Sequence, residues 1–335
     1  MLATITMGLM LGASACATQR VSARHPEPEA FTFTWTTSDG DEWTHAALVE
    51  RPDPGRDRGV GVALFSGGYA TDLHWTVPGS YEHDGQRDQF TIDGGPTRDA
   101  DALAAALVDG GFTVMRYSAI REGDPLHAED PAMCEVRPFP ETVAMANAAW
   151  GAMLGRAGLE PGEVFVLGHS LGGPRSMLAS DGAAAGCVLL AGAYMTPNRT
   201  GSRALAEAAA GEPGEDSDGS GEISGWERAA ATALRTGETR SAERLEIHGG
   251  SFEWASDVLA RSEGPALAVW GGLDTISYHG PVLEHLLGDC VETVYFANLG
   301  HNLGPEDEHG RTGPIDDRVV GCVVGWLIKR AEAAP

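Results

Sequence analysis

A serine at the centre of a glycine-rich pentapeptide carries the strongest chemical signal in the sequence. Residues 168–172 read Gly-His-Ser-Leu-Gly, between an apolar run that predicts a buried strand and a segment that predicts a helix. A serine on such a sharp strand-to-helix turn needs a strained backbone, and the flanking glycines leave room for neighbouring chain. The helix would direct its N-terminal N–H groups at a reacting oxygen. We therefore expect Ser170 to act as a nucleophile.

A serine hydroxyl is a poor nucleophile at its ordinary pKa, so a base and an orienting acid should accompany it. Asp274 and His301 each come just after an apolar run that predicts a strand. An open α/β sheet places its ligands at the carboxyl ends of its strands. We expect His301 to be the base and Asp274 the acid. The competing residues are Asp289 and Glu292 for the acid, and His279, His285 and His309 for the base.

The chain order Ser170, Asp274, His301, together with the strand–serine turn–helix arrangement, resembles the α/β-hydrolases. The resemblance covers about residues 55–330, apart from one insertion. It implies an α/β-hydrolase fold, with a mostly parallel central sheet flanked by helices and a helical cap insertion. It also implies Ser170 as nucleophile, His301 as general base and then acid, and Asp274 as the carboxylate that orients the imidazole.

An oxyanion hole needs two N–H donors that are in place before the reaction begins. One donor should be the amide of Leu171, directly after the nucleophile. The other should come from residues 66–72, SGGYATD, which resemble the GSGP-x-D loop of some bacterial esterases. Gly68 and Tyr69 both remain candidates for this second donor. The residues that match the esterase loop are Gly67, Gly68, Tyr69 and Asp72.

A second motif lies in the acidic stretch of residues 216–227, DSDGSGEISGWE. It follows the twelve-residue EF-hand loop, with Gly221 at the sharp turn and a serine at position 5, where Asp or Asn is commoner. We expect the loop to bind a structural Ca²⁺, and no organic cofactor is expected. The alternative is a solvated Gly/Ser/Asp loop. The expected ligands are Asp216, Asp218, Ser220, the backbone carbonyl of Glu222, and bidentate Glu227.

Strands and helices alternate along most of the chain, which is typical of a parallel sheet covered on both faces. Residues 199–263 are rich in Ala and Gly and interrupt this alternation, so we interpret them as a cap inserted into a core of residues 31–198 and 264–335. A hairpin over residues 31–50 and a strand ending at residue 65 open the core. Further strands are expected over residues 112–117, 163–169, 186–193, 265–272 and 291–297. Helices are expected over residues 99–109, 141–156, 171–179, 280–287 and 316–331.

The charge of the chain excludes one class of partner. The 335 residues carry a formal net charge of −25 at pH 7, whereas binding to nucleic acid requires Lys and Arg to displace counterions. The 42% hydrophobic content is enough for a substantial core. No protein partner can be inferred from the sequence.

The N-terminus predicts export. Residues 1–15 are apolar and uncharged, too short to span a bilayer comfortably, and typical of a signal peptide. Ala13-Ser14-Ala15 before Cys16 resembles a bacterial lipoprotein cleavage box, which implies attachment to a membrane through an acylated Cys16. The alternative is an ordinary cleaved signal and secretion. Residues 17–30 would then be an exposed linker.

Four further cysteines would permit two disulfides in an exported protein. They are Cys134, Cys187, Cys290 and Cys322. We favour a pair between Cys290 and Cys322, which flank the last expected strand and helix, over buried free thiols.

These patterns predict an exported serine hydrolase that cleaves carboxylic esters of small molecules or lipids through an acyl-enzyme. A peptidase, amidase or thioesterase could use the same three residues. A non-catalytic, calcium-dependent binding protein on the same fold is the alternative from another class. Haloalkane dehalogenase chemistry is disfavoured, because it needs a carboxylate where Ser170 lies.

Overall fold

The computed structural model describes residues 26–67, 71–83, 86–122, 139–192, 264–274 and 291–333. Several expectations therefore fall outside the described residues. They are the signal segment with Cys16, the loop residues Gly68 and Tyr69, Cys134, the cap with its calcium loop 216–227, the helix near 280–287, and Cys290.

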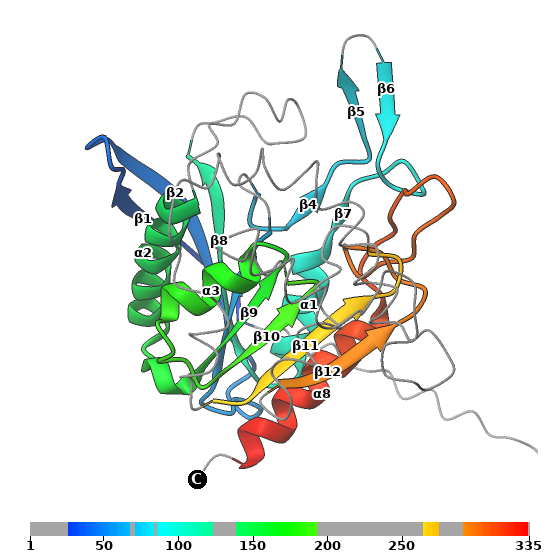
Figure 1. Ribbon diagram of the computed structural model, residues 1–335. Coiled ribbons are helices and arrows are strands. Elements are labelled where there is room, and N and C mark those ends of the chain that lie inside the picture. The colour runs from blue at the N-terminus through cyan, green and yellow to red at the C-terminus, as the bar shows by residue number, and fades with distance from the viewer. Residues whose placement is uncertain are drawn as a thin grey trace, which may run out of the picture.

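In the described part of the chain, eight strands form one sheet in the order β1-β2-β8-β3-β9-β10-β11-β12 (Figure 1). β2 pairs antiparallel with β1 on one side and with β8 on the other. The remaining pairs, from β8 through β3 to β12 in the sheet order, are all parallel. The expected mostly parallel sheet is confirmed. The strands are β1 (Glu29–Thr36), β2 (Glu42–Glu50), β3 (Gly61–Phe65), β8 (Thr113–Arg121), β9 (Val164–His169), β10 (Gly186–Leu190), β11 (Ala266–Gly271) and β12 (Val291–Phe296).

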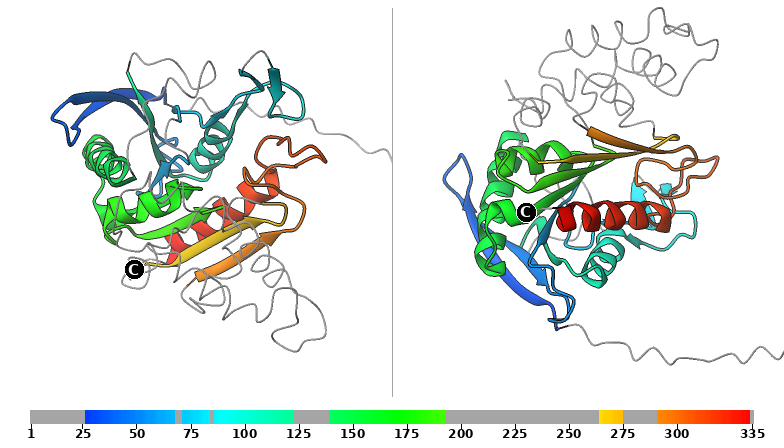
Figure 2. Two further views of the ribbon diagram at one scale, coloured as in Figure 1. Left: turned by 45° about the horizontal axis from the view of Figure 1, so that its top comes forward. Right: turned by 90° about the horizontal axis from the view of Figure 1, so that it is seen from below.

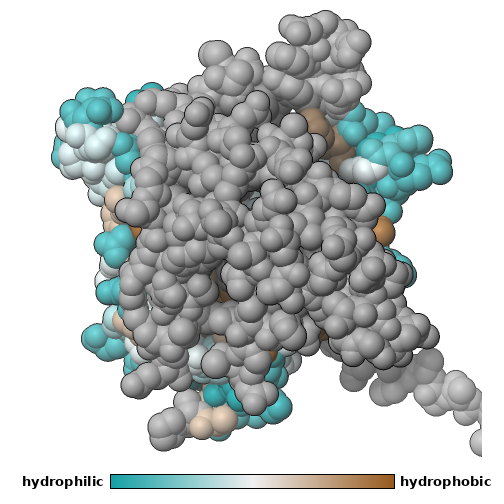
Figure 3. Space-filling view, in the orientation of Figure 1, coloured by the Kyte–Doolittle hydropathy of each residue, from teal (hydrophilic) through white to brown (hydrophobic). Residues whose placement is uncertain are grey.

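The burial of each strand follows its sequence pattern. β3, β10 and β11 are buried at every position, as their continuous apolar runs predict for strands covered on both faces. β2 alternates between buried and partly exposed residues because only one of its faces packs on a helix layer. The turn between β1 and β2 exposes residues 38–41, which form a hydrophilic corner at the left of Figure 3.

Helices cover both faces of the sheet (Figure 2). α2 (Phe139–Ala157) and α3 (Gly172–Ser180) pack on one face, while α1 (Asp99–Asp109) and α8 (Asp317–Ala333) pack on the other. α1 buries Leu103 and Leu107 at helical spacing, and α8 buries Val319, Val323 and Leu327 in the same way. The sheet is thereby held between two apolar layers that fix where its carboxyl ends lie.

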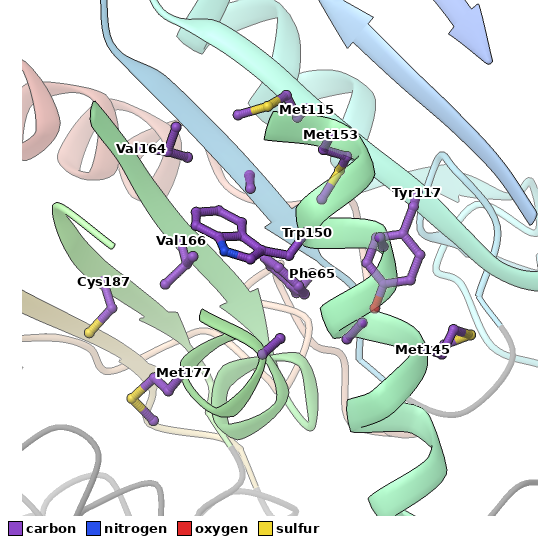
Figure 4. Close-up of a cluster of buried hydrophobic side chains, with 14 of the residues drawn as sticks. Phe65, Met115, Tyr117, Met145, Trp150, Met153, Val164, Val166, Met177 and Cys187 are labelled. Carbon is purple, nitrogen blue, oxygen red and sulfur yellow. The ribbon is translucent and has the colours of Figure 1, made fainter. Parts of the chain in front are cut away.

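The core beneath α2 and α3 contains large aromatic side chains (Figure 4). Trp150 of α2 lies over Phe65 of β3, with ring centroids 6.5 Å apart. Tyr117 of β8 meets the edge of Phe65 at 5.7 Å. These contacts tie the helix layer to the last residue of β3, from which the loop toward Ser170 departs.

Two small strand pairs between β3 and α1 are absent from the sequence-based prediction. β4 (Thr76–Val77) pairs with β7 (Thr97–Arg98), and β5 (Ser80–His83) pairs with β6 (Gln86–Gln89). These strands are only two or four residues long. Such short segments show too little periodicity to be distinguished from loops.

The expected pairing of Cys322 with Cys290 is wrong, because Cys322 is a free thiol. It lies half-buried on α8, where burial raises the pKa of its thiol. Cys187 is also free; it is enclosed in the apolar layer beneath α3, and burial raises its pKa to about 12. Both side chains behave as small apolar residues of the core. Among the described helices, none is both long and apolar enough to cross a membrane.

A buried carboxyl group joins α1 to the chain before α8. Asp99, the first residue of α1, is buried and accepts a hydrogen bond from the Ile315 N–H at 3.0 Å. Burial raises its pKa from 3.8 to about 6, although hydrogen bonds from Ile315 and Thr97 act in the opposite direction. The folded protein therefore binds this proton more tightly than the unfolded chain does.

Replacing Asp99 with Asn is expected to raise the free energy of unfolding at pH 7.5 by up to about 3 kcal/mol. The reason is that wild-type stability falls as pH rises from 3.8 to about 6, by roughly 1.4 kcal/mol per unit. Asn keeps an acceptor for Ile315 without the charge. Urea unfolding measures the difference between variant and wild type, which should shrink below about 1 kcal/mol at pH 4. An equal difference at both pH values would contradict this account.

Candidate active site

Ser170 lies on a left-handed turn between β9 and α3. Its φ is 51°, a conformation that costs a non-glycine residue on the order of 1–3 kcal/mol. Two backbone bonds fix it there: the Ser170 N–H donates to the Leu190 carbonyl at 2.9 Å, and the Ser170 carbonyl accepts from the Gly173 N–H at 3.0 Å. The turn directs a small hydroxyl side chain to the carboxyl edge of the sheet.

The glycines beside Ser170 are required by close backbone packing. A Cβ on Gly168 would lie 2.2 Å from the Gly172 carbonyl oxygen, and a Cβ on Gly172 would lie 2.1 Å from the Phe65 carbonyl oxygen. Both distances are well below van der Waals contact, and the obstructing atoms are backbone. The expected role of these glycines as space for neighbouring chain therefore has a direct geometric basis.

His301 and Asp274 form a hydrogen-bonded pair at the same edge. His301 Nδ1 lies 3.0 Å from Oδ2 and 3.1 Å from Oδ1 of Asp274. The Asp274 side chain is 1% exposed and that of His301 is 17% exposed, so the carboxylate is enclosed while the imidazole still reaches the surface. A buried carboxylate in this position stabilises the Nδ1–H tautomer and leaves Nε2 for other partners.

Backbone contacts between two neighbouring loops bring this pair together. The loop after β11 donates from Leu273 N–H to the Leu299 carbonyl at 2.9 Å. Glycine permits the approach, because a Cβ on Gly271 would lie 2.2 Å from that same carbonyl oxygen. A tight turn then presents His301, closed by the Gly300 N–H donating to the Gly304 carbonyl at 3.0 Å.

The structure also places two of the competing residues. Glu292 lies on β12 and forms an ion pair with Arg330 of α8. His309 is exposed and lies beside Glu308, 3.7 Å away. Neither is part of the His301–Asp274 pair, and the remaining competitors, Asp289, His279 and His285, lie outside the described residues.

One fold combines this sheet order with a strained serine turn after a central strand and a His–Asp pair after the last two strands. The chain has the α/β-hydrolase fold. No family model matches the sequence, and no curated protein resembles it in a sequence search.

Three solved structures illustrate the likeness. A hyperthermophilic esterase from the archaeon Pyrobaculum calidifontis is 18% identical, with a TM-score of 0.48 over 92% of this chain and 87% of that one. Brefeldin A esterase, a bacterial homologue of human hormone sensitive lipase, is 17% identical, with a TM-score of 0.49 over 98% and 81%. Dipeptidyl peptidase 4 from Porphyromonas gingivalis is 13% identical, with a TM-score of 0.44 over 91% and 36%.

The loop after β3 lies directly against the nucleophile. A Cβ on Gly67 would be 2.9 Å from Ser170 Cβ, so the loop backbone and the serine are in contact. The Gly67 carbonyl accepts from Thr71 Oγ1 at 2.6 Å, and the two candidates for the second oxyanion donor lie outside the described residues. Asp72, which the esterase resemblance singled out, accepts from the N–H groups of His74 and Thr76 at 3.0 Å and so caps the turn that follows.

Leu171, the other expected oxyanion donor, precedes the first residue of α3 and has helical backbone angles. The N–H groups of a first helical turn need acceptors outside the helix. The Leu171 amide thus lies at the positive end of α3, next to Ser170, and its role as an oxyanion donor stays a prediction.

Two buried arginines hold the loop after β3 at both ends, and no local sequence pattern predicts the role of either. Arg175 of α3 is fully buried and donates to the Ser66 carbonyl at 3.0 Å. Arg116 of β8 donates to the Leu73 carbonyl at 3.0 Å and pairs with Asp101 at 2.5 Å. Burial lowers the pKa of Arg175, although the adjacent Tyr117 phenol opposes the change.

Glu306 is a further carboxylate beside the pair. A Cβ on Gly300 would overlap Glu306 Oε2, so this side chain lies against the backbone next to His301. Burial and then the negative charge of Asp274 raise the pKa of Glu306, whereas the charge on His301 acts in the opposite direction.

Gly172→Ala is expected to lower the free energy of unfolding by about 3 kcal/mol, because its methyl group would meet the backbone of β3 with no side chain able to yield. Gly151→Ala is the matched control. Gly151 is exposed on α2 and has open space around its Cβ direction, so Ala should stabilise the helix by about 1 kcal/mol. Urea unfolding of both variants checks the pair, and equal effects would refute the packing account.

Proposed function

We propose that this chain is a serine hydrolase that cleaves carboxylic esters through an acyl-enzyme on Ser170. The observation that supports it best is the hydrogen-bonded His301–Asp274 pair, located at the same sheet edge as a serine held at a φ of 51°. A strained serine at a helix N-terminus and an oriented imidazole are the parts that acyl transfer requires.

The position of Asp274 supports the proposed role of His301 as the base. With Nδ1 donating to the carboxylate, the neutral ring offers the Nε2 lone pair to the Ser170 hydroxyl. When Nε2 takes the proton, the imidazolium remains stabilised by a carboxylate that is only 1% exposed. Asp274 therefore orients the base and balances its charge without accepting the proton.

The reaction then proceeds in two halves. Ser170 Oγ attacks the ester carbonyl carbon as its proton moves to His301 Nε2, and the C=O bond becomes a C–O⁻ oxyanion. The tetrahedral intermediate collapses, the alkoxide leaves with the proton from His301, and an acyl-serine remains. Water then gives a proton to His301 and attacks the acyl carbon. Collapse returns the proton to Ser170 Oγ and releases the carboxylic acid, which ionises to carboxylate at neutral pH.

Two N–H donors would stabilise the oxyanion in both halves. The Leu171 amide would supply the first, at the start of α3. The second would come from Gly68 or Tyr69, on the loop whose described neighbour Gly67 touches Ser170. The buried arginine at the Ser66 carbonyl supports this loop from beneath.

Wild-type protein is expected to react covalently with a fluorophosphonate probe, and Ser170→Ala to lose the label completely. Asp274→Asn should fold but lower kcat for a p-nitrophenyl ester by about 10⁴, because the imidazole would adopt the wrong tautomer. Ser176→Ala is the control, since Ser176 is a buried serine of α3 that donates to the Gly173 carbonyl. Folded wild type that stays unlabelled and hydrolyses no ester would refute the proposal.

The substrate class is tested by matched leaving groups. A short-chain p-nitrophenyl ester, the corresponding thioester and the corresponding p-nitroanilide present one acyl group to the same serine. We expect the ester to be cleaved with the highest kcat/KM. A preference for the anilide would instead support a peptidase or amidase, and a preference for the thioester a thioesterase. Esters of graded acyl length would then report the shape of the acyl pocket.

We propose in addition that residues 216–227 bind Ca²⁺. The support is the spacing of oxygen donors in the sequence, from Asp216 to Glu227, which fits the chemistry of a hard divalent cation. A single loop of this kind would bind at about 10⁻⁴–10⁻³ M, the range of extracellular modules, which agrees with the proposed export of a lipoprotein anchored at Cys16. The ion would order the inserted segment by mass action wherever calcium is millimolar.

Terbium luminescence tests this loop, because Trp226 is adjacent to the expected ligand Glu227 and should sensitise a bound lanthanide. We expect emission on adding Tb³⁺ and its displacement by Ca²⁺. Asp216→Ala combined with Glu227→Gln should abolish the signal, whereas Glu27→Gln, at an exposed site outside the loop, should not. Emission that survives the double substitution would exclude the site.

A further inference from the structure

His169 is the last residue of β9, directly before Ser170, and it contacts two of the loops that assemble the site, those after β3 and β12. Its Nε2 lies 3.0 Å from the His301 carbonyl oxygen, and the two imidazole centroids are 5.1 Å apart. Its ring also stacks on Trp75, in the loop after β3, with centroids 6.1 Å apart and planes tilted by 32°. One side chain at the end of β9 therefore links the loop after β3 to the loop after β12.

Gly67 packs against the Nδ1 side of the His169 ring, whereas Nε2 faces the His301 carbonyl. A Cβ on Gly67 would lie 2.9 Å from His169 Nδ1, so the loop backbone closes over this nitrogen. The same imaginary Cβ would lie 2.9 Å from Ser170 Cβ. His169 is thus confined between the loop that carries the oxyanion candidates and the loop that carries the base.

The hydrogen bond also defines the protonation state of His169. A carbonyl oxygen only accepts, so Nε2 must carry the proton and donate to His301. Burial, followed by the positive charge of His301, lowers the pKa of His169 to about 4; the His301 carbonyl and the Asp274 carboxylate act in the opposite direction. The ring is neutral at physiological pH and can lie beside a protonated His301 without opposing its charge.

We propose that His169 is a positioning residue: by donating to the His301 carbonyl, it holds the catalytic base in register with Ser170 and with the loop after β3. This inference rests on the proposed function for its effect on catalysis, while the contact itself is independent of it. His169 does not touch the reacting atoms. It acts through the backbone of His301, and a misplacement of about 1 Å at that residue can cost about a hundredfold in rate.

The experiment compares three substitutions. His169→Phe keeps an aromatic ring beside Trp75 but removes the hydrogen-bond donor. His169→Asn is polar but too short to reach the His301 carbonyl. His169→Gln can place an amide N–H near the position of Nε2. We expect Phe and Asn to lower kcat for a p-nitrophenyl ester by about ten- to a hundredfold, with KM changed less than about threefold. Gln should recover most of the loss. Far-UV circular dichroism and urea midpoints establish that each variant folds.

A second measurement reads the position of His301 without relying on turnover. The proton between His301 Nδ1 and Asp274 gives a low-field ¹H resonance, which Asp274→Asn should abolish and thereby assign. We expect this resonance to shift or broaden in His169→Phe and His169→Asn and to persist in His169→Gln. A purely structural role would leave it unchanged.

The outcomes separate the two proposals. If wild type is active and the folded Phe and Asn variants keep kcat within about twofold with an unchanged resonance, the positioning role is overturned and the proposed hydrolase stands. If wild type neither hydrolyses esters nor takes the probe, the hydrolase proposal fails. In that case the resonance alone decides whether His169 positions His301.

Discussion

The contact between Gly172 and the end of β3 is the constraint on which the site depends. Its missing side chain lets the first turn of α3 approach the Phe65 carbonyl, where a Cβ would lie 2.1 Å away. That approach and the bond to Leu190 hold Ser170 in a left-handed conformation that an unsupported serine would leave. The loop after β3, anchored at Ser66, then lies on the serine because the end of β3 is in contact with the start of α3.

Charge at the site is arranged around one enclosed carboxylate. Asp274 is almost completely buried, and its hydrogen bond to His301 compensates for the loss of water. Two charged imidazoles 5.1 Å apart would repel each other by about 3 kcal/mol at an effective dielectric constant of 20. A neutral His169 avoids this repulsion if the proposed reaction places a positive charge on His301.

Candidate site residues that directly follow a strand could be identified from the sequence. Residues that position the site through contacts with distant parts of the chain could not. Ser170, Asp274 and His301 each follow a predicted strand, so periodicity and residue type were sufficient to nominate them, and the structure brings Asp274 and His301 together. His169 and Arg175 act on carbonyls 132 and 109 residues away in the chain, and no local pattern encodes such partners. The parallel sheet was predictable from its buried runs. The short β4–β7 and β5–β6 pairs were not, because polar segments of this length resemble loops.

The same burial that tunes the site also balances its response to acid. Asp99 has a folded pKa of about 6 against an ordinary 3.8, so its contribution to stability is present at low pH and is lost as pH rises through that window. His169 has a folded pKa of about 4 against 6.5, so its contribution is present above pH 6.5 and is lost as pH falls toward 4. The two windows overlap between about pH 4 and 6 with opposite signs. A buried acid at the start of α1 therefore offsets the acid sensitivity that a neutral, buried histidine imposes beside the nucleophile.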